Sequence, residues 1–142
     1  YRMSNVVAAI GIGQLEVLAD RVNQKRQIAQ WYRQRLEQID GLKLMPEAVF
    51  ARATRWLTVF TIDPAKIKTR PLDIVAALEA NNIESRPVWK PLHVQKAFAD
   101  CRSVGGDVAM ALYENGICLP CGTAMTEDEV SRVCDIIKNV VK

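Results

Sequence analysis

The sequence predicts an α+β domain, a two-layer sandwich in which a long N-terminal helix precedes a small, mostly antiparallel sheet covered on one face by helices. Three observations predict it. Apolar residues recur at helical spacing over the first 40 residues, one β-branched and aromatic run follows, and short helical and extended segments alternate after it. A length of 142 residues suits a single domain over residues 1–142.

The first segment, from Ser4 to about Asp40, is predicted to be one continuous helix. Ser4 is a suitable N-cap and Gly41 a suitable C-terminal stop. Lys25 is the one polar break in an apolar series with three- and four-residue steps. That series is Ala8, Gly11, Leu15, Leu18, Val22, Ala29, Tyr32, Leu36 and Ile39. At 1.5 Å per residue the helix would be about 54 Å long, well above the usual length.

Small residues crowd the first turns of this helix, at Ala8, Ala9, Gly11 and Gly13. A glycine inside a helix costs about 1 kcal/mol relative to alanine, so close approach by another backbone is the expected reason for them. No later segment is an obvious partner. The neighbour expected from this pattern is a second domain or a second subunit.

The middle of the chain predicts strands and a helix. A short apolar run at 42–45 precedes residues 55–63 (RWLTVFTID), whose β-branched and aromatic residues predict a strand. Residues 71–82 predict a helix that tolerates Pro71 in its first turn.

The last third continues this alternation. Residues 83–88 are predicted to be extended, because the prolines nearby disfavour a helix before them. A helix at 107–115 and a short strand at 117–119 follow. The sequence Thr126-Glu127-Asp128-Glu129 is a capping box for a final helix. The residues expected to face inward from that helix are Val130, Val133, Ile137 and Val140.

Composition limits the possible partners and compartment. A net charge of +3 is too small to indicate a nucleic-acid partner. The longest apolar run, Val6–Ile10, is far shorter than the ~20 residues that cross a bilayer, so we expect no membrane span. A domain of this size can build its core without disulfides, which favours reduced thiols and a cytoplasmic protein.

Two short motifs have weak functional interpretations. Gly11-Ile12-Gly13 is half of a dinucleotide fingerprint, but it lacks the third glycine and follows no strand. Cys118-Leu119-Pro120-Cys121 has the CxPC form of thiol oxidoreductases. The next helix begins about five residues too late to lower the pKa of the first cysteine.

A metal site is not expected. A zinc site would require the four cysteines to converge, and Cys134 is expected to lie buried in the last helix. His93 is the only histidine, which excludes a cluster of several histidine ligands.

The segment ESRPVWKPLHVQ carries Arg86, Trp89, Lys90 and His93 on a proline-stiffened backbone. Such a segment costs little entropy to order, which suits a binding loop. It is equally compatible with a proline-rich connector whose side chains are simply exposed. The residue chemistry leaves both interpretations open.

Three stretches together resemble one family. They are YRMSNVVAAIGIGQLE, NNIESRPVWKPLHVQKAF and GICLPCGTAMTEDEVSRV. They resemble, in order and spacing, the C-terminal part of the DegT/DnrJ/StrS sugar aminotransferases, which are fold-type I enzymes dependent on pyridoxal phosphate (PLP). The resemblance implies that this chain is the C-terminal small domain. The PLP-binding domain and its Schiff-base lysine would lie upstream, so we expect neither a catalytic residue nor bound PLP in this chain alone.

The resemblance also implies an activity. These enzymes move an amino group, usually from glutamate, to a keto sugar on a nucleotide, at sites formed between the subunits of a homodimer. The segment Tyr1–Asn5 would reach toward the neighbouring subunit's PLP phosphate and nucleotide-sugar, with the Arg2 guanidinium on phosphate oxygens and Asn5 hydrogen-bonding nearby. The residues that would line the sugar-nucleotide site are Arg86, Trp89, Lys90 and His93, with His93 positioning substrate. The motif ESRPVWKPLH is most similar to members that make 4-amino-4,6-dideoxy-N-acetyl sugars on UDP for pilin or surface glycans.

The sequence departs from the family pattern at two positions, and other interpretations stay open. Cys121 replaces a common serine, and Lys96 replaces a common proline. One alternative is a stand-alone module that dimerises through the long helix. Another is a homologue that acts as a regulator or dehydratase instead of a transaminase.

Overall fold

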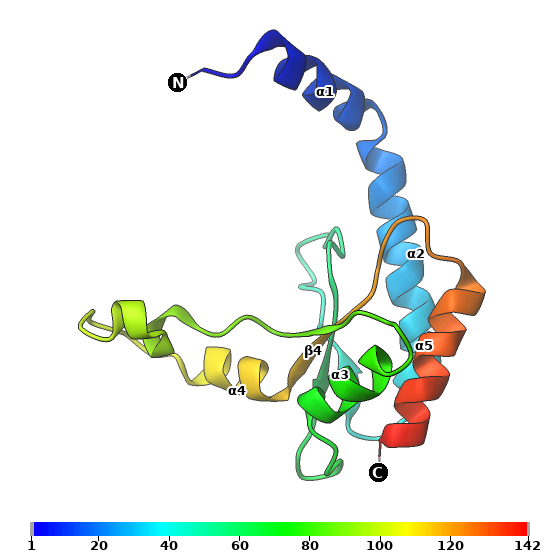
Figure 1. The fold of residues 1–142 in the computed structure, drawn as a ribbon, viewed down its shortest axis with the longest axis vertical. Helices are drawn as coiled ribbons and strands as arrows, with labels where there is room; N and C mark the ends of the chain where they lie inside the picture. Colours follow the sequence, from blue (N-terminus) through cyan, green and yellow to red (C-terminus); the bar gives the residue numbers. More distant parts are fainter. Residues whose placement is uncertain (1, 142) are drawn as a thin grey trace.

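The computed structural model describes residues 2–141 and confirms the α+β fold (Figure 1). Two helices come first, followed by two strands, and further helices then alternate with the remaining strands. The elements are α1 (Asn5–Glu16), α2 (Leu18–Leu36), β1 (Leu42–Leu44), β2 (Thr58–Ile62), α3 (Pro71–Glu79), β3 (Arg86–Pro87), the 3-10 turns η1 (Leu92–Val94) and η2 (Lys96–Phe98), α4 (Asp107–Asn115), β4 (Gly116–Leu119) and α5 (Glu127–Val140). Within this part of the chain, no helix is both long enough and apolar enough to span a membrane.

The sheet has the order β1-β2-β4-β3, and every neighbouring pair is antiparallel. Phe60 on β2 pairs with Leu44 on β1 and with Ile117 on β4, so it lies at the centre of the sheet. All four residues of β4 are buried, whereas β2 alternates between buried and half-buried residues. The predicted antiparallel sheet is therefore confirmed, with β4 as its most enclosed strand.

Helices α2, α3 and α5 cover one face of the sheet, while α4 and the segment before it extend on the other side (Figure 1). The core between helices and sheet has its most enclosed side chains at Tyr32, Phe60, Leu78 and Val130, each at most 1% exposed. The capping box of α5 is present: the Glu129 N–H donates to Thr126 Oγ1 at 3.3 Å, and the Thr126 N–H donates to Glu129 Oε2 at 2.8 Å.

The prediction of one continuous N-terminal helix is wrong. The helix breaks at Val17, which has φ −104° and ψ 1°, so α1 and α2 are separate. Packing anchors α2 through buried residues such as Ile28 and Tyr32, whereas α1 buries none of its residues. Without packing across the joint, continuity depends on intrinsic propensity, and a β-branched valine contributes little. The predicted N-cap at Ser4 is confirmed by its bond from the Val7 N–H.

Two boundaries also differ from prediction. The second helix ends at Leu36 rather than near Asp40, and Gly41, with φ +102°, makes the turn into β1. The strand predicted over 55–63 begins only at Thr58, because Arg55 has φ 54° and its guanidinium donates to the Met45 carbonyl at 2.6 Å. Tertiary contacts therefore shorten both elements.

The apolar side chains of α1 are exposed, although its sequence is among the most hydrophobic in the chain. Ile10, Ile12 and Leu15 are 60%, 61% and 69% exposed. A Cβ added at Gly11 or Gly13 would meet nothing within 4 Å. The close neighbour that these small residues predict is thus not supplied by residues 2–141, and its identity stays a prediction.

Candidate functional site

A cavity of about 770 Å³ opens between α2, the loop before β2, the segment around β3, α4 and the turn after β4. Three of the four predicted substrate-side residues line it, namely Arg86, Trp89 and Lys90. Short β3 holds this segment, since Arg86 pairs with Cys118 and Pro87 with Ile117 on β4. The structure therefore brings three of the four predicted substrate-side residues to one cavity.

His93 lies elsewhere, in a smaller cavity of about 280 Å³ with Phe98 and Arg102. Its imidazole packs against Gly106, the N-cap of α4, where an added Cβ would come within 2.7 Å of Cε1. The 3-10 turn Leu92–Val94 carries His93 away from Lys90. The grouping of all four residues in one site is thus not seen within residues 2–141.

The polar groups at the cavity differ in how far they are already paired. Arg86 Nε donates to Glu84 Oε1 at 2.8 Å, and both side chains are exposed. Lys90 is exposed, and neither its ammonium nor the hydroxyl of half-buried Tyr113 has a hydrogen-bond partner in the described part of the chain. Two donor groups are therefore available to a bound molecule.

Trp56 and Trp89 face each other at this cavity. Their ring centroids are 6.2 Å apart and their planes differ by 20°, which is a stacked arrangement. They are 68% and 64% exposed. Trp56 comes from the loop before β2, about thirty residues earlier in sequence than Trp89. The fold thus pairs two large, solvent-facing aromatic rings from distant segments.

Lys25 connects two segments of the cavity wall by hydrogen bonds, and these bonds account for the polar residue in the apolar series of α2. Its Nζ donates to the Cys121 carbonyl at 2.6 Å and to the Trp56 carbonyl at 3.1 Å. The Cys121 sulfur lies 3.6 Å from both Lys25 Nζ and the Trp56 carbonyl oxygen. Two turns further along α2, Tyr32 Oη donates to the Pro120 carbonyl at 2.9 Å. Helix α2 therefore fixes both the Trp56 loop and the turn after β4.

Replacing Lys25 with methionine is expected to lower the free energy of unfolding by about 1–3 kcal/mol, because the partly buried Cys121 carbonyl and the exposed Trp56 carbonyl lose their charged donor. Methionine keeps the length of the side chain and most of its apolar contact. Urea denaturation measures the loss. Lys96→Met is the matched control, since Lys96 is exposed and without a recorded partner in residues 2–141. Equal stability of the two variants would show that the bonds from Lys25 to the two carbonyls do not stabilise the fold.

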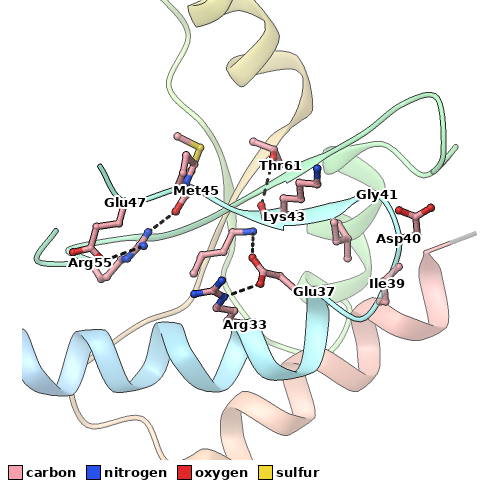
Figure 2. A pocket seen from close by; sticks show the side chains of 13 residues that line it. Arg33, Glu37, Ile39, Asp40, Gly41, Lys43, Met45, Glu47, Arg55 and Thr61 are labelled. Atoms are coloured by element: carbon pink, nitrogen blue, oxygen red, sulfur yellow. Dashed lines mark hydrogen bonds and ion pairs between the residues drawn. The ribbon is translucent and has the colours of Figure 1, made fainter. Parts of the chain in front are cut away.

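The loop that leads to Trp56 is also held by Glu47. This carboxylate accepts from Arg26 Nη1 at 2.8 Å and from the Ala53 N–H at 2.6 Å, and Arg55 Nη2 lies 3.6 Å away. Figure 2 shows Glu47 beside Arg55, whose guanidinium reaches the Met45 carbonyl. These bonds, chiefly the one from Arg26, lower the pKa of Glu47 from 4.5 to about 2.

The lowered pKa predicts how stability depends on pH. A carboxylate with a depressed pKa stabilises the fold fully above its unfolded value, and this contribution is lost as pH falls toward the folded value. For Glu47 the window runs from about pH 4.5 down to about 2. We expect the stability difference between wild type and Glu47→Gln to shrink across that window in urea denaturation. A constant difference would contradict the role of the ionised carboxylate.

The cavity in Figure 2 has a volume of about 670 Å³, and most of its charged groups are paired with one another. Glu37 accepts from Arg33 Nε at 2.7 Å and from the Leu44 N–H at 3.2 Å, joining the end of α2 to β1. We interpret this cavity as part of the structural joint between helix and sheet.

Cys118 and Cys134 are not activated thiols. Cys118 and Cys121 are each 7% exposed, and burial raises the pKa of the Cys118 thiol. Burial in α5 also raises the pKa of Cys134, to about 11. A high pKa keeps a thiol protonated and unreactive. Among residues 2–141, no three His, Cys, Asp or Glu side chains gather so that they could hold a metal ion.

Arg2 and Asn5 lie apart from the 770 Å³ cavity. Arg2 precedes the N-cap of α1 and Asn5 is its first helical residue, and both are exposed. This end of α1 projects away from the sheet (Figure 1). Tyr1, the first residue of the same predicted segment, lies outside the described residues. The two predicted cofactor-side residues are therefore not joined to the predicted substrate-side residues within this chain.

Three residues at the cavity were missed by the sequence interpretation: Lys25, Trp56 and Tyr113. The sequence predicted Trp56 to lie in a strand because its neighbours are β-branched. It predicted Tyr113 only as part of the helix at 107–115, with no indication of a binding role. Lys25 did give a signal, as the single polar residue in an apolar series. That signal did not indicate which carbonyls its ammonium would reach.

Comparisons with known proteins identify the relatives of this chain. A sequence model of the DegT/DnrJ/EryC1/StrS aminotransferase family matches residues 1–138. EpsN of Bacillus subtilis (strain 168), provisionally named a pyridoxal phosphate-dependent aminotransferase, is 44% identical over 96% of this chain. A GDP-perosamine synthase of Caulobacter vibrioides is 30% identical over 99% of it. The chain spans 36% and 38% of the lengths of these two relatives.

Solved structures have the same fold. The structure of DesI determined with its TDP-sugar product has a TM-score of 0.87 and 21% identity, and it matches 96% of this chain and 35% of the DesI chain. The aminotransferase PseC of Helicobacter pylori has a TM-score of 0.85 and 15% identity, matching 99% of this chain and 38% of its own. Both confirm the arrangement of helices and sheet.

Proposed function

The chain belongs to the DegT/DnrJ/EryC1/StrS aminotransferase family, and on that premise we propose that it is the C-terminal small domain of a PLP-dependent sugar aminotransferase. The complete enzyme would transfer an amino group from glutamate to a keto sugar carried on a nucleotide. It would work in the cytoplasm as a homodimer, and its product would enter surface polysaccharide or pilin glycans. The larger domain with the Schiff-base lysine would precede this chain.

The match of the family over residues 1–138 carries this proposal. The names of the relatives add the class of substrate: GDP-perosamine synthase names a nucleotide sugar, and SpsC of Bacillus subtilis (strain 168), 28% identical, is named a spore coat polysaccharide biosynthesis protein. The 770 Å³ cavity supports it further, because Arg86, Trp89 and Lys90 combine cations with an aromatic ring, as a phosphorylated sugar requires.

The N-terminal end of α1 has a donor set that fits the phosphate of PLP. Arg2 and Asn5 are exposed, and Asn5 opens a twelve-residue helix whose first backbone N–H groups lie at the same end. In the proposed enzyme these groups would bind the phosphate of the cofactor held by the partner subunit. PLP itself, when bound, supplies the electron sink that lets an amino group be removed and transferred.

The cavity residues would bind and orient the nucleotide-linked substrate. Arg86 and Lys90 would place positive charge near its phosphates. His93, from its separate cleft beside α4, would contact the substrate at a second position and hold it in place. None of these residues would carry the amino group.

Absorbance spectroscopy tests the proposal on the full-length protein, purified with PLP. Adding glutamate is expected to replace the absorbance band of the bound cofactor with that of its pyridoxamine form. A protein that binds no PLP, or binds it without responding to any amino donor, would contradict the proposal and favour a regulator or a dehydratase.

A further inference from the structure

The Trp56–Trp89 pair is a stacked contact between two rings that also face solvent. The ring centroids are 6.2 Å apart, and both side chains are about two-thirds exposed. A flat ring between two others makes two contacts of about 3.5–4.0 Å, which requires about 7–8 Å between the outer rings. The two tryptophans would therefore need to move apart to admit one ring.

The two rings are carried by segments that can hold them in position. Trp89 follows the two-residue strand β3 and lies between Pro87 and Pro91, so its backbone has little freedom. The Trp56 carbonyl is bound by Lys25 on α2 at 3.1 Å. The indoles stay exposed while their backbones are fixed. This arrangement lowers the entropy cost of binding a planar ligand.

Available positive charge lies next to the aromatic pair. Lys90 directly follows Trp89, and its ammonium has no recorded partner in residues 2–141. Arg86 is paired with Glu84 at the surface, and such an exposed pair contributes little stability, so an anion can exchange for Glu84. Lys25 is different, because its ammonium is already bound by two carbonyls. Lys90 is thus the cation best suited to receive a phosphate.

The cavity offers more surface for stacking than free groups for the edge of a base. Its described lining contains no asparagine or glutamine, and Arg86 is paired with Glu84, so Ser85 and Tyr113 are the neutral polar side chains that could bond a base edge. Stacking between a base and aromatic rings tolerates any base, since each base has a π face. Recognition by stacking alone would therefore distinguish poorly between pyrimidine and purine nucleotides.

From these observations we propose that Trp56 and Trp89 clamp the base of a nucleoside diphosphate between their indole rings, with Lys90 on the diphosphate. This site rests on the proposed function, because that function supplies the nucleotide-linked substrate. It adds Trp56, a residue on a different segment from the predicted loop. It also predicts that the base is held by stacking, so UDP and GDP bind with affinities within a few-fold of each other.

Isothermal titration calorimetry with UDP, GDP and inorganic pyrophosphate tests this site on the full-length protein. Trp56→Ala is expected to weaken UDP and GDP binding about 5- to 100-fold, whereas Trp56→Phe keeps most of the affinity. Pyrophosphate, which has no base, is expected to bind more weakly than UDP and to be insensitive to Trp56→Ala. Lys90→Ala is expected to weaken all three ligands.

Phe50→Ala is the matched control, because Phe50 is 91% exposed, lies in the same loop as Trp56 and does not line the cavity. The site is overturned if Trp56→Ala binds UDP like the control, if wild type binds pyrophosphate as tightly as UDP, or if neither nucleotide binds. The PLP absorbance response of the same preparations separates the two proposals. If the PLP absorbance responds normally to glutamate but UDP binding does not depend on Trp56, only the base-binding proposal is wrong. If UDP binding depends on Trp56 but the PLP absorbance does not respond, only the aminotransferase proposal is wrong.

Discussion

Replacing Phe60 with alanine is expected to lower the free energy of unfolding by about 3–5 kcal/mol. Its ring is 1% exposed and lies on the central part of β2, paired with Leu44 and Ile117 on the two neighbouring strands. Truncation removes buried apolar surface and leaves a cavity between the sheet and helices α2, α3 and α5. That loss is a large fraction of the stability of a typical domain.

The chain contains a natural control for this experiment. Phe50 is 91% exposed, so Phe50→Ala is expected to change the free energy of unfolding by no more than about 0.5 kcal/mol. Urea denaturation followed by circular dichroism compares the two truncations directly. Similar losses in the free energy of unfolding for Phe60→Ala and Phe50→Ala would contradict the position of Phe60 in the core.

Replacing Gly116 with alanine is expected to destabilise the fold by at least about 1–3 kcal/mol and to displace the loop that carries Trp89. A Cβ at this position would come within 2.3 Å of the Leu112 carbonyl oxygen and 2.5 Å of Val88 Cγ2. The backbone carbonyl cannot move without disturbing the end of α4. The Val88 side chain can move only with the neighbouring binding loop.

Gly122→Ala is the matched control, because a Cβ there would meet nothing within 4 Å and its φ is not positive. That substitution is expected to be neutral or slightly stabilising, since alanine restricts the unfolded chain. Thermal unfolding compares the two variants. The loop displacement has its own measurement, because the proposed UDP affinity should fall in Gly116→Ala and stay unchanged in Phe50→Ala, which does not line the cavity. A Gly116→Ala protein as stable as the control would contradict the close approach of Val88.

Local chemistry was sufficient for several elements of the fold. The helix predicted at 107–115 has those bounds in the structure, and the capping box at Thr126 opens the last helix. Both depend on residues within one or two helical turns. Of the four residues expected to face inward from the last helix, Val140 is only half-buried, while the predicted burial of Cys134 is confirmed.

The candidate site was predicted only in part. Arg86, Trp89 and Lys90 lie close together in sequence on a stiff segment, so their shared position could be anticipated. His93 lies only three residues further on, yet the turn Leu92–Val94 places it against Gly106. Its separation depends on a contact with a glycine thirteen residues later, which no local pattern indicates.

By itself, the sequence determined the type and order of the elements, the α+β class and the family, because these depend on spacing, caps and motifs read along the chain. Only the tertiary structure decided where the long helix breaks at Val17, where β2 begins, and that Trp56 faces Trp89 across one cavity. The start of β2 and the facing tryptophans depend on contacts between distant segments, such as Lys25 with the Trp56 carbonyl, whereas the helix breaks at Val17 because α1 lacks buried contacts. Propensity acts over a few residues, whereas such contacts exist only once the chain has folded.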